Sequence, residues 1–261
     1  MNSMAANGEE QRQTVSLLGV NIDVVDTAGL CQKLVDFSAE ESTRTVMYVN
    51  ADCMLISQKN EKYRQTLNGA DLIYADGVGV VHGVKLWGQT LPGRSTAADF
   101  MSDFCRIFAG KGLKLFLLGA AEGVAREAAN RLRQDIPGLQ IVGTHHGFFT
   151  PEENESVVAE INASKPDIVV VGFGAPHQEF WIEQNAAQLE ASVVWGVGGL
   201  FDFLSGRTKR GPQWLLDHGF EWLCRLFTEP RRLWRRYLVG NTKFVLILLR
   251  HRYFSKVSIL S

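Results

Sequence analysis

Short apolar runs rich in Val, Ile and Leu alternate with longer segments of helical pattern over residues 15–206. This alternation constrains the fold of the chain more than any other feature of its sequence. Runs of this kind, separated by crossover helices, are typical of parallel strands that are buried on both faces. The pattern predicts strands at residues 16–25, 44–50, 72–75, 114–119, 140–145, 167–172 and 192–197. We therefore expect an α/β fold: a Rossmann-like, mostly parallel sheet flanked by helices.

Signals for helix starts lie between these runs. Thr27 and Thr96 each precede an apolar pattern of helical period. Thr150-Pro151-Glu152-Glu153 combines an N-cap, a proline at the first helical position and a glutamate at the third. These signals support helices between the strands.

The charge is distributed unevenly along the chain. Of 27 Lys and Arg and 28 Asp and Glu, twelve basic and three acidic residues lie in 207–261, so this segment carries +9 and the remainder −10. The segment is also rich in Trp, Phe and Leu, with Pro230 interrupting its helical pattern. We expect a disordered lead at 1–14, an α/β catalytic domain at 15–206 and a basic, aromatic helical appendage at 207–261 that associates with an anionic membrane surface.

Three features of the sequence indicate the cellular compartment of the protein: its N-terminal residues, the length of its apolar runs and its cysteines. Residues 1–14 contain no apolar signal-peptide core, and no apolar run approaches the ~20 residues of a transmembrane helix. The four cysteines form no C-x-x-C pair and are expected to be buried thiols. These features predict a cytoplasmic protein.

Polar and glycine-rich segments follow five of the predicted strands. Ligands of an open parallel sheet bind beyond the carboxyl ends of its strands, so these segments are the first candidates for a site. They are Asn50-Ala-Asp52, Asp76-Gly-Val-Gly79, Gly119-Ala-Ala-Glu-Gly123, Gly172-Phe-Gly-Ala-Pro-His-Gln-Glu179 and Gly196-Val-Gly-Gly-Leu-Phe-Asp202. Glycine allows a ligand to approach the backbone but also serves tight turns, and several glycines on one sheet edge favour a nucleotide. Neither G-x-G-x-x-G nor G-x-x-x-x-G-K-[ST] occurs, which disfavours a dehydrogenase or a P-loop enzyme.

Individual polar residues in these segments have more than one interpretation. Asp76 could cap the following helix, or it could act as a general base toward an acceptor hydroxyl. Asn50 and Asp52 could likewise be helix caps. No Asp-x-Asp occurs, and His145 and His146, as neighbours on a strand, would point to opposite faces, so no metal site is expected.

Longer motifs in the chain resemble those of the WecG/TagA/CpsF family, glycosyltransferase family 26. The motifs are Asp76-Gly-Val-Gly, Arg94, Pro-Gly-Leu-x-Ile-Val-Gly at 137–143, Gly147-Phe-Phe, Pro166-Asp-Ile-Val-Val-Val-Gly-Phe-Gly, Pro176-x-Gln-Glu, Gly196-Val-Gly-Gly-x-Phe-Asp-Phe-x-x-Gly, and Glu221-Trp-Leu-x-Arg-Leu with Glu229-Pro-x-Arg. The resemblance runs from about residue 17 to about residue 249.

The resemblance implies an inverting, metal-independent transferase with no cofactor. Its donor would be a UDP-sugar carrying N-acetylmannosamine, the corresponding uronic acid, or a hexose such as glucose. Its acceptor would be a polyprenyl-diphosphate-linked saccharide used in cell-surface polysaccharide synthesis at the inner face of the bacterial plasma membrane. The enzyme would be a peripheral membrane protein there.

The resemblance also implies roles for individual residues. Asp76 would be the base, and Arg232 and Arg235 of the appendage would be catalytic groups that supply positive charge in place of a metal. Membrane or solvent contact is the alternative role for these arginines. The predicted substrate-binding residues are Asn50, Tyr48, Arg94, Gln178, Gly119, Gly174, Gly198, Gly199, Asp202 and Arg225, with Asp202 holding the nucleoside.

Three departures from the family pattern lie near the expected pocket. Tyr48 stands where a threonine is usual, His177 replaces a common lysine, and Gly93-Arg94-Ser-Thr-Ala replaces Glu-Arg-Val-x-Gly. They leave the donor and acceptor open. The rival interpretation is a non-catalytic α/β protein that binds a nucleotide or a membrane. No nucleic-acid partner is expected, and a homo-oligomer is compatible with the sequence.

Overall fold

The computed structural model describes residues 12–208, 211–212, 215, 221–228 and 230–257. Its strands are β1 (Thr14–Leu17), β2 (Val20–Asp23), β3 (Arg44–Val49), β4 (Leu72–Ala75), β5 (Lys114–Gly119), β6 (Gln140–His145), β7 (Ile168–Gly172) and β8 (Val193–Gly196). Its helices up to residue 208 are α1 (Thr27–Ser38), α2 (Ala51–Ser57), α3 (Glu61–Asn68), α4 (Val78–Leu86), α5 (Ala97–Gly110), α6 (Val124–Asp135), η1 (Pro151–Glu153), α7 (Asn154–Ser164), α8 (His177–Asn185), η2 (Ala186–Gln188) and α9 (Leu200–Leu204).

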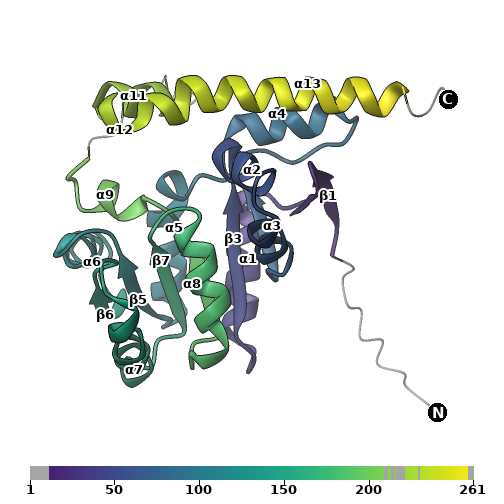
Figure 1. Ribbon diagram of the computed structural model, residues 1–261. Coiled ribbons are helices and arrows are strands. Elements are labelled where there is room, and N and C mark those ends of the chain that lie inside the picture. The colour runs from purple at the N-terminus through teal and green to yellow at the C-terminus, as the bar shows by residue number, and fades with distance from the viewer. Residues whose placement is uncertain (1–11, 209–210, 213–214, 216–220, 229, 258–261) are drawn as a thin grey trace, which may run out of the picture.

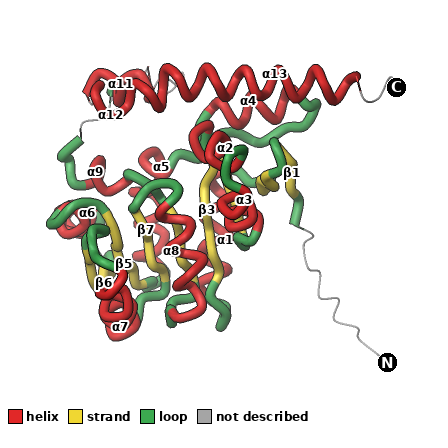
Figure 2. Tube along the Cα trace, viewed as in Figure 1, coloured by secondary structure: helices red, strands yellow, loops and turns green. Residues whose placement is uncertain are grey.

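The main sheet confirms the predicted parallel α/β fold. In the described part of the chain its strand order is β4-β3-β8-β7-β5-β6, and every neighbouring pair is parallel. The central strands β7 and β8 are buried along their whole length, as expected for strands covered on both faces. Figures 1 and 2 show helices on both sides of these strands.

Two residues of β8 show which helices cover the two faces. Trp195 stacks on Phe100 of α5, with 6.1 Å between the ring centroids. A Cβ atom at Gly196 would overlap the Gln178 amide of α8. Since successive strand residues point to opposite faces, α5 and α8 pack on opposite sides of the sheet.

The first predicted strand is wrong, because residues 16–25 do not form one strand. The segment forms an antiparallel hairpin, β1 and β2, that turns at Leu18 and Gly19, where φ is positive (51° and 81°). The apolar residues on both arms are buried, so the alternating pattern of the sequence is equally compatible with a continuous strand and with a hairpin. The expected disordered lead is also wrong for residues 12–14, because Arg12 pairs with Asp23 and β1 begins at Thr14; residues 1–11 lie outside the described residues.

Helix starts agree with the predictions in part. Thr150 and Glu153 form the reciprocal hydrogen bonds of a capping box around Pro151. Asp26, rather than Thr27, caps α1 by accepting a hydrogen bond from the Gly29 amide. Thr96 precedes α5, but its hydroxyl does not cap that helix.

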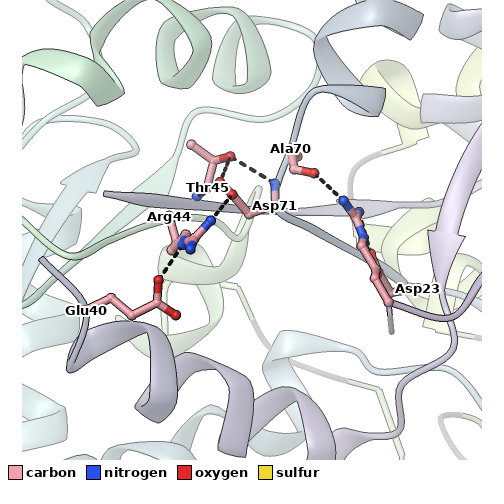
Figure 3. Close-up of polar contacts among 7 residues, drawn as sticks. Asp23, Glu40, Arg44, Thr45, Ala70 and Asp71 are labelled. Carbon is pink, nitrogen blue, oxygen red and sulfur yellow. Dashed lines mark hydrogen bonds and ion pairs between the residues drawn. The ribbon is translucent and has the colours of Figure 1, made fainter. Parts of the chain in front are cut away.

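A network of polar side chains connects the amino ends of β3 and β4 (Figure 3). Asp71 accepts hydrogen bonds from the amide and hydroxyl of Thr45 and from Arg44, at 2.8, 2.9 and 3.0 Å. Arg44 also donates to Glu40 of the segment that enters β3, at 2.6 Å. The amino ends of these strands are thereby held together by hydrogen bonds within the protein.

The C-terminal helices form a layer beside α2 and α4 (Figure 1). They are α11 (Glu221–Thr228), α12 (Pro230–Trp234), the π-helical η3 (Arg235–Gly240) and α13 (Asn241–Val257). Phe244 and Leu248 of α13 are buried in the same core as the sheet, and Phe244 lies against Gly79 of α4. The predicted appendage is therefore helical and packs on the α/β body. None of the helices described is long and apolar enough to cross a membrane.

Candidate active site

The carboxyl ends of the six parallel strands surround a cavity of about 850 Å³. Residues that follow β3, β4, β5, β6, β7 and β8 all contribute to its wall. Six predicted binding or catalytic residues line it: Tyr48, Asn50, Asp76, Gly174, Gly199 and Asp202. Its position agrees with the expectation that ligands of an open parallel sheet bind beyond the strand carboxyl ends.

Asp76 directly follows β4 and faces the cavity. The helix after it, α4, has Gly77 rather than Asp76 at its N-cap. Thr96 donates a hydrogen bond from its hydroxyl to Asp76 Oδ1 at 2.7 Å, and Arg94 donates to the Thr96 hydroxyl at 2.9 Å. Arg94 also pairs with Asp99 at 3.3 Å. This chain of contacts orients the Asp76 carboxylate, which has the position and chemistry required of a general base.

Asn50 and Tyr48 lie at the end of β3. Asn50 caps α2 through hydrogen bonds from the amides of Asp52 and Cys53, at 3.0 and 3.1 Å, so the capping interpretation is confirmed for a residue that also lines the cavity. Tyr48 is only 6% exposed, and burial raises the pKa of its hydroxyl well above the ordinary value. It presents a neutral phenol to the cavity.

Three of the predicted binding residues, Gln178, Gly119 and Gly198, lie behind the wall of the cavity rather than in its lining. Gln178 is completely buried beneath it and bonds to Glu179 and to the Gly198 amide. Gly119 and Gly198 both have positive φ, and a Cβ atom would overlap the Gly172 backbone at the first position and the Tyr48 hydroxyl at the second. These glycines allow close backbone packing behind the cavity wall, and Gln178 supports that wall from below.

Aromatic side chains form the wall at the end of β6 and β7. Phe173 lies in edge contact with Phe149 and Trp181, at centroid distances of 5.8 and 5.6 Å. Phe148 lines the same cavity and is 79% exposed. This wall offers planar apolar surfaces to a ligand and was not identified from the sequence, although Gly147-Phe-Phe is among the family motifs.

A second cavity of about 320 Å³ adjoins the first, beneath the C-terminal helices. It lies between α2, α4 and η3–α13, and its apolar wall includes Trp222, Tyr237, Phe244 and Val245. Arg94 lines this cavity. Four residues line both cavities: Asn50, Asp76, Thr96 and Arg236. The candidate base is therefore accessible from two cavities of different composition.

Among the described side chains of the C-terminal helices, the arginine that lines both cavities is Arg236, which sequence analysis missed. The predicted catalytic residue Arg235 is exposed, with its guanidinium 5.3 Å from the centroid of the Trp234 ring. Adjacent residues on a helix point in different directions, so only one of this pair can face the cavities. The side chains of Arg225 and Arg232 lie outside the described residues, although their backbones belong to α11 and α12.

Arg236 is paired with Asp52 in the first turn of α2. Its Nε lies 3.0 Å from Asp52 Oδ2, without the alignment of a hydrogen bond. Burial lowers the pKa of Arg236, but the charges of Asp52, Tyr237, Tyr48 and Cys53 together raise it, so the net value lies above the ordinary one. The guanidinium is a permanent positive charge at the junction of the two cavities.

Thr96 was also missed, although a local signal exists. It lies two residues after Arg94 in the extended segment before α5, and residues two apart in extended chain share a face. No comparable local signal distinguishes Arg236 from Arg235, because the choice depends on how the C-terminal helices dock.

The histidine pair at the end of β6 departs from the expected geometry. The strand ends at His145, and the rings of His145 and His146 lie 4.5 Å apart rather than on opposite faces. His146 Nε2 is 3.2 Å from Glu122. Within the described residues, no group of three or more His, Cys, Asp or Glu is arranged to hold a metal ion.

Comparisons with known proteins find relatives and a family that match most of this chain. A protein of Bacillus spizizenii named N-acetylglucosaminyldiphosphoundecaprenol N-acetyl-beta-D-mannosaminyltransferase is 35% identical over 206 residues, which are 79% of this chain and 79% of that protein. A protein of the same name from Staphylococcus aureus is 32% identical over 231 residues, which are 87% of this chain and 90% of that protein. The family described as Glycosyl transferase WecG/TagA/CpsF matches residues 15–258. The chain therefore belongs to the WecG/TagA/CpsF family of glycosyl transferases.

Proposed function

We propose that the protein transfers a sugar from a UDP-sugar to a polyprenyl-diphosphate-linked saccharide, with inversion and without a metal, in the synthesis of a cell-surface polysaccharide. One observation carries the proposal: a carboxylate oriented by Thr96 lies where two dissimilar cavities meet. The names of the two relatives specify N-acetylmannosaminyl transfer to N-acetylglucosaminyl-diphosphoundecaprenol. Among the donors considered, they favour UDP-N-acetylmannosamine over its uronic acid or a hexose such as glucose.

The larger cavity suits the donor. Its volume of about 850 Å³ falls in the range of small-molecule sites, and its wall combines glycine backbone, Asp202 and aromatic rings. Backbone at Gly174 and Gly199 allows a diphosphate to approach closely. Aromatic rings and a carboxylate suit the base and the ribose of a nucleoside.

The smaller cavity suits the acceptor. Its wall under the C-terminal helices is largely aromatic and aliphatic, and it contains Asp76 and Arg94. An acceptor sugar entering there would bring its hydroxyl to Asp76, while its lipid would remain toward the apolar C-terminal helices.

The reaction is a single displacement. Asp76 takes the proton of the acceptor hydroxyl, the hydroxyl oxygen forms a bond to the anomeric carbon, and the bond from that carbon to the diphosphate oxygen breaks. UDP departs with the electron pair, and the configuration of the anomeric carbon inverts. Arg236 lines both cavities. Its guanidinium would stabilise the negative charge that develops on the diphosphate. A guanidinium can bind two phosphate oxygens at once, which is the role that a metal ion has in other transferases.

The C-terminal surface suits attachment to an anionic membrane. Exposed apolar side chains there lie among basic ones on α12, η3 and α13. The apolar residues are Trp234, Leu238, Val239, Val245, Leu246, Leu249 and Tyr253, and the basic residues are Arg231, Arg235, Lys243, Arg250 and Arg252. Each basic residue near an anionic leaflet contributes roughly 1 kcal/mol, and apolar burial adds to it. We propose that the protein is a peripheral protein of the inner face of the plasma membrane.

The function is tested with a panel of UDP-sugars and a polyprenyl-diphosphate-linked N-acetylglucosamine acceptor. Turnover with UDP-N-acetylmannosamine, an inverted anomeric product by NMR and full activity in EDTA are expected. If no UDP-sugar is turned over but a sugar carried by another nucleotide is, UDP-sugars are refuted as the donor class. Retained anomeric configuration would refute the single displacement, and loss of activity in EDTA would refute metal independence.

Membrane attachment has a separate test. The full chain should sediment with vesicles of phosphatidylglycerol and much less with vesicles of phosphatidylcholine. The double change Leu246→Glu and Leu249→Glu should weaken sedimentation, whereas Ile107→Glu, at an exposed apolar residue of α5, should not. Equal sedimentation of both variants would contradict the proposed membrane surface.

A further inference from the structure

Two consecutive polar side chains at the start of α8 are completely buried. Gln178 and Glu179 have no exposed surface. The Gln178 amide donates to Glu179 Oε1 at 3.0 Å, and the Gly198 backbone amide donates to Gln178 Oε1 at 2.7 Å. A continuous chain of hydrogen bonds therefore runs from Glu179 through Gln178 to the turn between β8 and α9.

That turn forms part of the wall of the larger cavity. Val197, Gly199 and Leu200 line the cavity directly. Gly198 itself is held between Gln178 on one side and the Tyr48 hydroxyl on the other, with no room for a Cβ atom. Gln178 is thus the side chain that fixes the Gly198 backbone from beneath the cavity.

Glu179 determines how Gln178 is held. An amide side chain can rotate, and its orientation depends on what its oxygen and nitrogen contact. Glu179 Oε1 accepts from the nitrogen, so the oxygen is directed at Gly198. Without this acceptor, the Gln178 nitrogen would be left buried without a partner or would turn toward another group.

The surroundings of Glu179 give it no other evident role. Tyr63 of α3, Cys53 of α2 and Tyr48 of β3 are its titratable neighbours. Glu179 Oε2 and the Tyr63 hydroxyl are buried without a hydrogen-bond partner among the described residues. Burial raises the pKa of Glu179 to about 7. Burying a carboxyl group with one unpartnered oxygen costs folding free energy. We therefore expect Glu179 to contribute by holding the cavity wall in place rather than by stabilising the fold.

We propose that Glu179 is a positioning residue of the donor cavity: through the Gln178 amide it fixes the turn at 197–200 in the conformation that binds the donor nucleotide. The assignment of the nucleotide rests on the proposed function, whereas the link from Glu179 to the turn rests on the hydrogen bonds alone.

Three variants of the full chain test this link. Glu179→Ala removes the acceptor, and the Kd for UDP measured by calorimetry should rise about tenfold, the value of a lost buried hydrogen bond. Glu179→Gln retains a carbonyl acceptor without ionising, and its Kd should stay within about twofold of the unmodified protein. Glu183→Ala, at an exposed position of the same helix, should have no effect.

In the transfer assay, Glu179→Ala should raise the KM for the donor about as much as the Kd for UDP, with a smaller change in kcat. A merely structural defect would not be rescued selectively by glutamine. If Glu179→Gln bound UDP as weakly as Glu179→Ala, the hydrogen-bond link would be refuted. Unchanged UDP binding by Glu179→Ala would also refute it.

Hydrogen exchange without nucleotide separates this inference from the proposed function. Peptides that cover residues 196–202 should exchange faster in Glu179→Ala than in Glu179→Gln, while peptides from β5 should be unchanged. Equal protection of 196–202 in both variants would refute the link. Failure of the unmodified protein to bind UDP would refute the nucleotide assignment, and the exchange result would still decide the link.

Discussion

The two ends of the parallel strands carry similar polar residues but use them differently. At the amino ends, Asp71 accepts three hydrogen bonds from Thr45 and Arg44 (Figure 3). Asp167 accepts one from the Lys114 amide. At the carboxyl ends, Asp76, Asn50 and Arg236 converge on open cavities. The carboxylates of the first group join one strand to the next, whereas the side chains of the second group face space that a substrate would occupy.

The difference indicates that residues important for stability and residues important for turnover lie at opposite ends of the parallel strands. Hydrogen bonds within the protein at the amino ends are complete before any ligand binds, so they contribute to stability. Polar groups at the carboxyl ends also have partners within the protein, but they face the cavities, where substrate and transition state can bind them. Changes at the first end should therefore alter stability, and changes at the second should alter turnover.

The largest effect is expected at Asp76. Asp76→Asn removes the proposed base while keeping the size of the side chain, and kcat should fall about 10³-fold, within the range found for general bases. UDP affinity, measured by calorimetry, should be nearly unchanged because the nucleotide would lie in the larger cavity. A variant that retained full kcat would refute the assignment of Asp76 as the base.

The next effect is expected at Arg236. Arg236→Ala removes the positive charge between the cavities, and kcat should fall about 10²-fold, as for loss of one transition-state donor. Arg235→Ala is the matched control, since that neighbour is exposed over Trp234, and its kcat should change less than about twofold on soluble acceptor. The reverse order of effects would show that Arg235 faces the site.

At the amino ends, the expected effect is on stability. Asp71→Ala removes the acceptor of three hydrogen bonds, and the free energy of unfolding in urea should fall by about 2 kcal/mol. Turnover per folded molecule should stay constant, because Asp71 lies at the opposite end of β4 from Asp76. A loss of kcat as large as that of Asp76→Asn would break the distinction between the two ends.

The last prediction concerns Glu179, buried beneath the cavity wall. Its native pKa of about 7 is above the ordinary 4.5, so the folded state binds this proton more tightly than the unfolded state. Its contribution to stability is therefore fully present below about pH 4.5 and is lost as pH rises through about 7. Glu179→Gln should reduce the fall in unfolding free energy between about pH 5 and about pH 8, measured by urea titration. An unchanged slope would show that Glu179 ionises normally.

Much of the fold was predictable because it follows local patterns. Buried runs such as 167–172 and 192–197 specify parallel strands by their length and β-branched residues, and both strands are found there. The hairpin at Leu18 and Gly19 was missed because both arms of a hairpin can continue the same alternation. Asn50 and Asp76 could be placed in the site because residues after parallel strands must share one edge of the sheet.

The sequence by itself determined a parallel α/β sheet, the sheet edge that carries the candidate site, and the glycosyltransferase family, since periodicity and ordered motifs are properties of the chain alone. Tertiary structure decided which side chains meet at that edge. It placed Arg236 rather than Arg235 at the junction of the cavities, buried Gln178 beneath the wall, and joined Thr96 to Asp76. These outcomes depend on how segments distant in sequence dock and on which face a helix turns inward, and such orientations are fixed by packing rather than by local pattern.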